Sequence, residues 1–157
     1  LAYKKLSGCA PGELVRFRSD LAIIADKQGG HTRFGFLQPH CILSRYPSDT
    51  DCVSYGTDWL LVPEPGDETV PRNNQHTEES GALHLDASGM LMTFSPSREG
   101  MALPLALRLP SMEVVETPGY NSAPILRWKL WLSEAARDRG EEPFFQFPPP
   151  APEPAED

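Results

Sequence analysis

The apolar positions of this chain fall in short alternating runs, a period-two pattern that predicts half-buried β-strands. The clearest example is "LAIIADKQGGHTRFGFLQ" at residues 21–38, where two apolar segments flank a pair of glycines. Gly29 and Gly30 can adopt the positive φ values that a two-residue hairpin turn needs. We therefore predict a hairpin in which Asp26 lies opposite Arg33 as an oppositely charged cross-strand pair.

The register of this hairpin also pairs apolar residues: Ala25 with Phe34, Ile23 with Phe36, and Ala22 with Leu37. A second hairpin is predicted at residues 81–94, with Ser88 and Gly89 at its turn. It pairs Leu83 with Phe94 and Leu85 with Met92. Further strands are predicted where apolar runs are bounded by Pro, Asp, Ser or Gly, at residues 12–17, 41–47, 52–56, 58–65, 101–109 and 111–116.

Residues 123–139 have the pattern of a helix, with a proline in the first turn and a glycine just after the end. At 100° per residue, Trp128 and Trp131 fall on an apolar stripe that would face the core. Leu126 and Leu130 fall on the opposite, polar side, four residues apart and stacked together. We expect this leucine pair either to meet a second layer of the protein or to form an interface with another chain.

Together these elements predict a mainly β fold, a small antiparallel barrel or sandwich of about 8–9 short strands. One C-terminal amphipathic α-helix would pack on it. With 157 residues the chain has the length of one domain, which we assign to residues 1–147. Residues 148–157 are rich in proline and acidic residues, so we expect a disordered tail that adds nothing to the core.

The charge of the chain is unevenly distributed. Residues 1–40 hold six basic and three acidic side chains, whereas residues 41–80 hold two basic and eight acidic ones. The net charge of −8 argues against nucleic-acid binding, because affinity for phosphates depends on Lys and Arg. A local basic face is still available, which we interpret as solvated surface; its members are Lys4, Lys5, Arg16, Arg18 and Arg33. The sequence contains no run of 18 apolar residues, so it predicts no membrane-spanning helix.

The three cysteines, Cys9, Cys41 and Cys52, show no CxxC spacing and leave one thiol over in any pairing. Free thiols of this kind are typical of a reducing compartment, so we expect a cytoplasmic protein. His40 and Cys41 are adjacent and would point to opposite faces of a strand. We therefore interpret them as a surface histidine beside a buried structural cysteine rather than as a base and its nucleophile.

His84 and Asp86 are two positions apart on a predicted strand, so both would project from the face opposite Leu83 and Leu85. Such a pair could bind a metal, or act as a base with its orienting carboxylate, and His76 could add a third ligand. No fixed spacing supports a third ligand. We interpret His84 and Asp86 as exposed polar residues of a half-buried strand, and we expect no metal.

The chain contains no glycine-rich phosphate loop, no HExxH and no GxSxG motif, and we expect no cofactor. The sequence therefore favours a non-catalytic protein-interaction or assembly module that binds a protein partner or a second copy of itself through Leu126 and Leu130. The alternative is a small metal-assisted hydrolase that uses His84 and Asp86.

Overall fold

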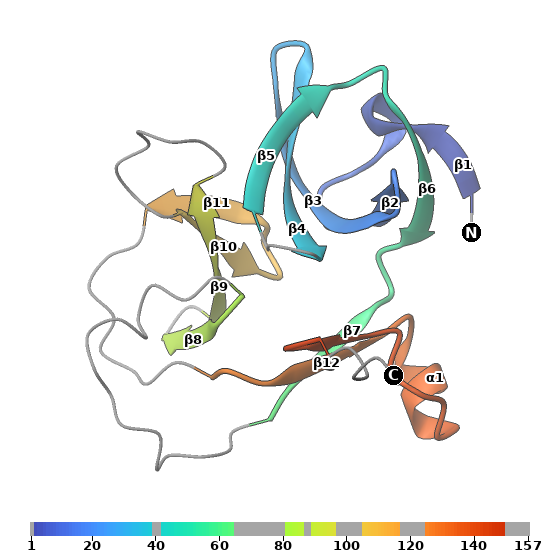
Figure 1. The fold of residues 1–157 in the computed structure, drawn as a ribbon, viewed down its shortest axis with the longest axis vertical. Helices are drawn as coiled ribbons and strands as arrows, with labels where there is room; N and C mark the ends of the chain where they lie inside the picture. Colours follow the sequence, from blue (N-terminus) through green and yellow to red (C-terminus); the bar gives the residue numbers. More distant parts are fainter. Residues whose placement is uncertain are drawn as a thin grey trace, which may run out of the picture.

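A computed structural model of the chain describes residues 2–38, 42–64, 81–86, 89–96, 105–116 and 125–149. This part of the protein is mainly β, as the sequence predicts, with 13 strands and one short α-helix. The strands form three antiparallel sheets (Figure 1). The expected number of strands was too low, because residues 2–5, 128–131 and 145–147 form strands where none was predicted.

The first sheet contains six strands in the spatial order β1-β6-β2-β3-β4-β5. It is strongly curled, so that β2 to β6 surround a common interior (Figure 1). Among the described residues β1 and β5 do not pair with each other, so the sheet does not close into a barrel. Its elements are β1 (Ala2–Lys5), the 3-10 turn η1 (Leu6–Gly8), β2 (Leu14–Phe17), β3 (Asp20–Gln28), β4 (His31–Gln38), β5 (Ile42–Pro47) and β6 (Asp51–Gly56).

The second sheet contains β8 (Leu83–Asp86), β9 (Gly89–Pro96), β10 (Leu105–Leu109) and β11 (Glu113–Glu116). It joins the first sheet through a short parallel pairing of β5 with β9. The third sheet has β12 (Trp128–Trp131) between β7 (Leu60–Pro63) and β13 (Phe145–Phe147), and the helix α1 (Glu134–Asp138) follows β12.

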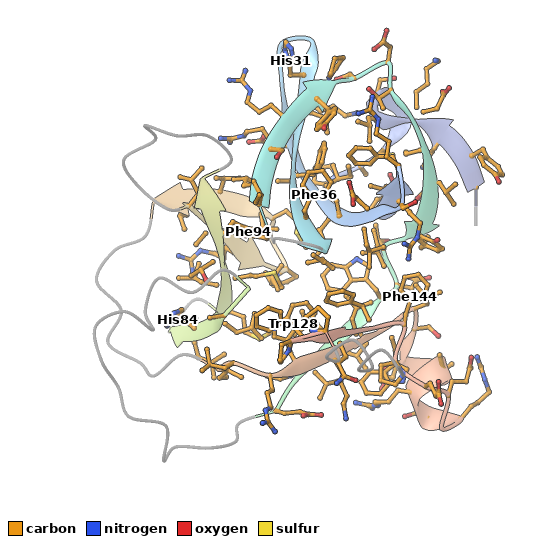
Figure 2. The ribbon with its side chains drawn as sticks, in the orientation of Figure 1. His31, Phe36, His84, Phe94, Trp128 and Phe144 are labelled. Atoms are coloured by element: carbon orange, nitrogen blue, oxygen red, sulfur yellow. The ribbon has the colours of Figure 1, made fainter. Side chains whose placement is uncertain are left out.

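Both faces of the first sheet contribute buried residues, and because successive side chains on a strand point to opposite sides, these residues form two separate clusters. One face packs against the other two sheets in an apolar cluster that includes Leu14, Ile23, Phe94 and Trp128. Figure 2 shows Phe94 and Trp128 in the region where the sheets meet. The other face lines the interior of the curl, with Leu6, Cys9, Val15, Phe17, Ala22, Ile24, Phe34 and Cys52.

The hairpin of β3 and β4 confirms the predicted turn at Gly29 and Gly30. Asp26 lies opposite Arg33, whose Nε donates to Oδ1 of Asp26 at 2.7 Å. The predicted apolar pairs are wrong, however, because the register shifts by one between Ile24 and Asp26. The observed pairs beyond this bulge are Ile24 with Phe34, Ile23 with Gly35, and Ala22 with Phe36.

The hairpin of β8 and β9 is present, but its predicted register is wrong by two positions. Leu83 pairs with Met92 and Leu85 pairs with Met90. Gly89 pairs with Asp86 and therefore belongs to β9 rather than to the turn. A side chain at Gly89 would lie 2.9 Å from the carbonyl oxygen of Leu109, so glycine is needed here for the approach of another strand.

The predicted helix at 123–139 is wrong for most of its length. Residues 128–131 form the central strand of the third sheet, in which Leu130 pairs with Leu61 on one side and with Phe145 on the other. The two neighbouring strands provide hydrogen-bond partners for the backbone of β12, and helix propensity does not take such partners into account. The only α-helix among the described residues is α1, which starts after Ser133; the Oγ of Ser133 accepts a hydrogen bond from the N–H of Ala136 at 3.0 Å.

Candidate functional site

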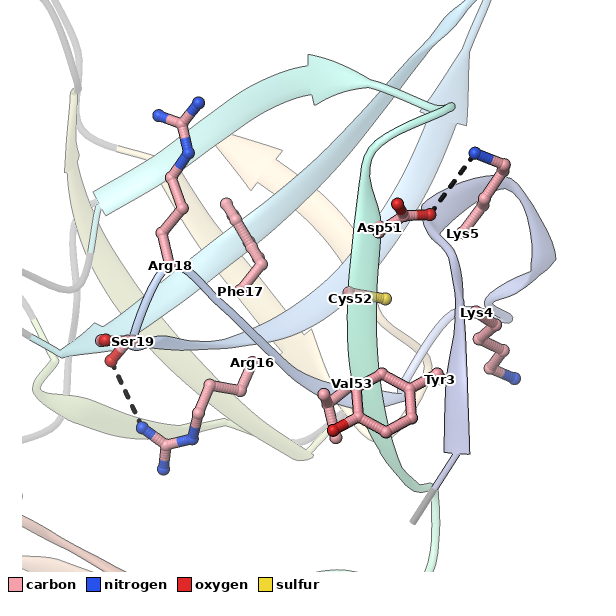
Figure 3. Close-up of a pocket in the computed structure, with 10 residues that line it drawn as sticks. All are labelled: Tyr3, Lys4, Lys5, Arg16, Phe17, Arg18, Ser19, Asp51, Cys52 and Val53. Atoms are coloured by element: carbon pink, nitrogen blue, oxygen red, sulfur yellow. Dashed lines mark hydrogen bonds and ion pairs between the residues drawn. The ribbon is translucent and has the colours of Figure 1, made fainter.

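An open pocket of about 590 Å³ lies where β1, β6 and the turn after β2 meet (Figure 3). Ten residues line it: Tyr3, Lys4, Lys5, Arg16, Phe17, Arg18, Ser19, Asp51, Cys52 and Val53. Four of these side chains are cationic and one is anionic, which gives the lining a charge of 4 − 1 = +3 in a chain whose net charge is −8. Such a local reversal of charge favours binding of a negatively charged group.

Strand register explains why Tyr3, Lys5, Arg16, Asp51 and Val53 share one face of the sheet. β6 lies between β1 and β2, and Val53 pairs with Tyr3 on one side and with Arg16 on the other. Residues paired directly across antiparallel strands project from the same face. Lys5 pairs with Asp51 in the next position on that face, because it lies two residues from Tyr3. The pocket therefore has Val53 in its floor and basic side chains on both sides.

A two-residue turn holds the rim of the pocket. Phe17 pairs with Asp20, so Arg18 and Ser19 alone connect β2 to β3. Their φ angles are 52° and 70°, the left-handed region that a twisted hairpin of this length requires. Neither residue is glycine, and side chains in this region cost conformational energy. This turn places the exposed Arg18 side chain at the rim of the pocket, although Asn-Gly would adopt the same positive φ angles at a lower conformational cost.

The basic side chains differ in how far they are neutralised. Nζ of Lys4 lies 2.5 Å from Oε1 of Glu13, whose side chain is 10% exposed. Lys5 lies 3.4 Å from Asp51, with both side chains well exposed, so water screens this pair. In the described part of the chain, Arg16 and Arg18 form no ion pair.

Arg16 is nevertheless held in place by other contacts. Its Nε donates to the hydroxyl of Tyr55 at 3.2 Å. Its Nη1 donates to the carbonyl oxygen of Ser19 at 3.3 Å (Figure 3). Its guanidinium carbon also lies 5.8 Å from the ring centre of Phe144, which comes from the third sheet. The positive charge of Arg16 is therefore positioned without being cancelled.

A buried polar cluster lies beneath the pocket, around the carboxylate of Glu13. Oε2 of Glu13 accepts from the N–H of Ala10 at 2.7 Å, and Oε1 accepts from the hydroxyl of Ser54 at 3.3 Å. Burial alone would raise the pKa of Glu13, but hydrogen bonds from Lys4, Cys9 and Ala10 outweigh it and lower that pKa. Glu13 is therefore a fixed anion under the floor of the pocket.

Cys9 and Cys52 lie in the same cluster, with their Sγ atoms 3.7 Å apart. Both are free thiols and both are buried. Burial raises the pKa of each thiol, and the neighbouring Glu13 raises it further. Each sulfur is consequently held in its neutral, weakly nucleophilic form.

The structure places the predicted catalytic candidates elsewhere. His84 is 1% exposed and Leu85 is 50% exposed, so the prediction that His84 faces outward is wrong. Figure 2 shows His84 on β8, far from the pocket. The backbone of Asp86 ends β8, whereas His76, His40 and Cys41 lie outside the described residues. No group of three or more potential metal ligands occurs in the described part of the chain.

The leucine pair is also placed differently from the prediction. Leu130 is fully buried in the core, packed with Trp128 and Phe145, while Leu126 is half-buried just before β12. The two leucines do not share an outward helix face, because this segment is a strand. Leu130 has no exposed surface, so the expectation that its side chain contributes to an interface with another chain is wrong.

Sequence reasoning had singled out Lys4, Lys5, Arg16 and Arg18 as a basic face but interpreted them as solvated surface. The structure brings these four together at the pocket, whereas Arg33 pairs with Asp26 and does not line the pocket. The i, i+2 spacing of Arg16 and Arg18 was the available signal. The contribution of Tyr3, which is 86% exposed, had no signal in the sequence, because it depends on the pairing of β1 with β6.

The chain matches no known family model, no curated protein and no solved structure. Among the described residues, no helix has both the length and the apolar character needed to cross a membrane.

Proposed function

We propose that this chain is a non-catalytic protein-interaction module and that the pocket of β1, β6 and the β2–β3 turn is its binding site. The observation that carries the proposal is the combination of an exposed aromatic ring, Tyr3, with uncancelled positive charges at Arg16 and Arg18. Tyr and Arg are the side chains most enriched where proteins bind each other strongly.

The groups that could have carried catalysis support this choice rather than the hydrolase alternative. His84 is buried in the core, and the thiols of Cys9 and Cys52 are buried with raised pKa values. A catalytic base or nucleophile has to reach its substrate in a reactive protonation state. The free thiols also support a reducing, cytoplasmic location. The apolar cluster shared by all three sheets supports a single sandwich-like domain over residues 1–147.

The experiment compares two exposed apolar residues on different sheets. Tyr3 on β1 and Leu85 on β8 are the large apolar side chains with the most exposed surface in the described part of the chain. Tagged wild type, Tyr3→Ala and Leu85→Ala are purified from cells, and co-purifying proteins are quantified by mass spectrometry. We expect at least one partner to decrease tenfold or more with Tyr3→Ala and to be unchanged with Leu85→Ala.

Two results would contradict the proposal. A partner lost only with Leu85→Ala would assign binding to the surface of β8. Co-purifying proteins that are the same for all three chains would remove the basis for a site at the pocket. Thermal melting of the purified variants serves as the control, since both side chains are exposed and neither change should unfold the protein.

A further inference from the structure

We infer that the pocket binds an extended acidic peptide segment that runs along β6 between its two basic sides. This inference rests on the proposed function and adds the chemistry of the partner. Tyr3 and Lys5 lie on one side of β6, and Arg16 and Arg18 lie on the other.

The spacing of the two sides fits one peptide chain. β1 and β2 are separated by β6, so their backbones are about 10 Å apart at the usual distance between neighbouring strands. An extended peptide directs successive side chains to opposite sides. Carboxylates on one side of such a peptide would approach Lys5, and those on the other side would approach Arg16 and Arg18.

The floor between the two sides distinguishes a peptide from a nucleic acid. Val53 offers an apolar surface, and Asp51 places an exposed negative charge beside Lys5. A peptide can set an apolar residue over Val53 and a neutral one near Asp51, because its charges are spaced by its own sequence. A phosphate backbone carries a charge at every nucleotide, so it cannot place a neutral group beside Asp51.

The side chains also suit carboxylate ligands. Arg16 and Arg18 have planar guanidinium groups that can hold a carboxylate through two parallel hydrogen bonds. Both lack an ion-pair partner among the described residues, and the Lys5–Asp51 pair is exposed and readily exchanged. Binding an acidic side chain therefore needs no strong internal ion pair to be broken.

The test uses a fluorescent nine-residue peptide, Asp-Glu-Ser-Asp-Val-Asp-Ser-Glu-Asp, with anisotropy measured at low and physiological salt. Its controls are a peptide with Lys and Arg at the acidic positions and a nine-nucleotide oligothymidine. We expect the acidic peptide to bind at least tenfold more tightly than either control, and to bind less tightly as salt increases.

The protein variants locate the site. Arg18→Asn keeps a residue that tolerates positive φ, and Lys5→Gln keeps the length of an exposed side chain. Each should weaken binding of the acidic peptide at least fivefold. Arg139→Gln removes one exposed positive charge beside α1 and serves as the matched control, with an expected change of less than twofold.

Three results would overturn the inference: no binding of the acidic peptide, equal or tighter binding of oligothymidine, or equal weakening by Arg139→Gln. The proposed function is tested separately by the dependence of cellular partners on Tyr3. If those partners depend on Tyr3 while the acidic peptide fails to bind, the module stands and only the acidic chemistry of its partner is refuted.

Discussion

Replacing Gly35 with alanine should destabilise the protein, because the position has no room for a β-carbon. Gly35 is buried in β4, opposite Ile23 on one side and Leu43 on the other. A β-carbon built there would overlap Cζ and Cε1 of Phe94 and lie 3.0 Å from its Cε2. Phe94 is fully buried in β9, so its rigid ring has no solvent to move into.

The magnitude follows from two opposing effects. Overpacking of a well-packed core by one carbon costs about 1–3 kcal/mol, and the severe overlap with Phe94 places this case in the upper half of that range. Alanine reduces the freedom of the unfolded chain and returns about 0.5–1 kcal/mol. We therefore expect a net loss of about 1–2.5 kcal/mol in the free energy of unfolding. For a chain of this length the loss lowers the melting temperature by about 2–10 °C.

Urea denaturation of Gly35→Ala measures the loss, and Gly30→Ala is the matched control. No atom lies within 4 Å of a β-carbon built at Gly30, so the same substitution there should leave the free energy of unfolding unchanged or raise it by up to about 1 kcal/mol. Combining Gly35→Ala with Phe94→Leu should recover part of the loss, because the shorter side chain vacates the space. Equal stability of Gly35→Ala and wild type, or strict additivity with Phe94→Leu, would refute the packing of β9 on β4.

Three further predictions concern the pocket and the core. Glu13→Gln should cost about 1–3 kcal/mol at neutral pH, because it removes a charged hydrogen-bond acceptor. Folding lowers the pKa of Glu13, so its contribution to stability is present above pH 4.5 and is lost as the pH falls further. In chemical denaturation, the free energies of unfolding of wild type and Glu13→Gln should therefore differ at pH 7 and converge towards pH 3. Ser19→Gly should raise the stability by about 1 kcal/mol in thermal melting, because it relieves a positive φ; a decrease would contradict the left-handed turn. Trp128→Ala should cost about 3–5 kcal/mol in urea denaturation, because the side chain is fully buried and its Nε1 donates to the carbonyl oxygen of Gly81; a cost below 1 kcal/mol would contradict its central position.

The β class and the first hairpin could be predicted because they depend on local chemistry. Alternating polarity indicates strands wherever one face is buried, and Gly29-Gly30 supplies the turn. The bulge at Ala25 could not be predicted, since it serves packing across the sheet. It sets Gly35 opposite Ile23, at the point where the ring of Phe94 from another sheet fills the space above glycine.

The segment at 123–139 shows how local preference can mislead. Its composition and its candidate caps favour a helix, yet Trp128 and Leu130 form a strand because β7 and β13 offer backbone partners on both sides. Those partners are distant in sequence, at residues 60–63 and 145–147. Only the last part of the segment remains helical, where Ser133 caps α1.

The sequence by itself determined which residues could be buried, where the first turn lies, and that the N-terminal part carries excess positive charge. Those properties follow from single residues and their near neighbours. The tertiary structure alone decided that Tyr3, Lys5, Arg16 and Arg18 share one pocket, because this depends on β6 pairing with both β1 and β2. It also decided that His84 and Leu130 are buried, because what covers each face of a strand depends on segments that pack on it from elsewhere in the chain.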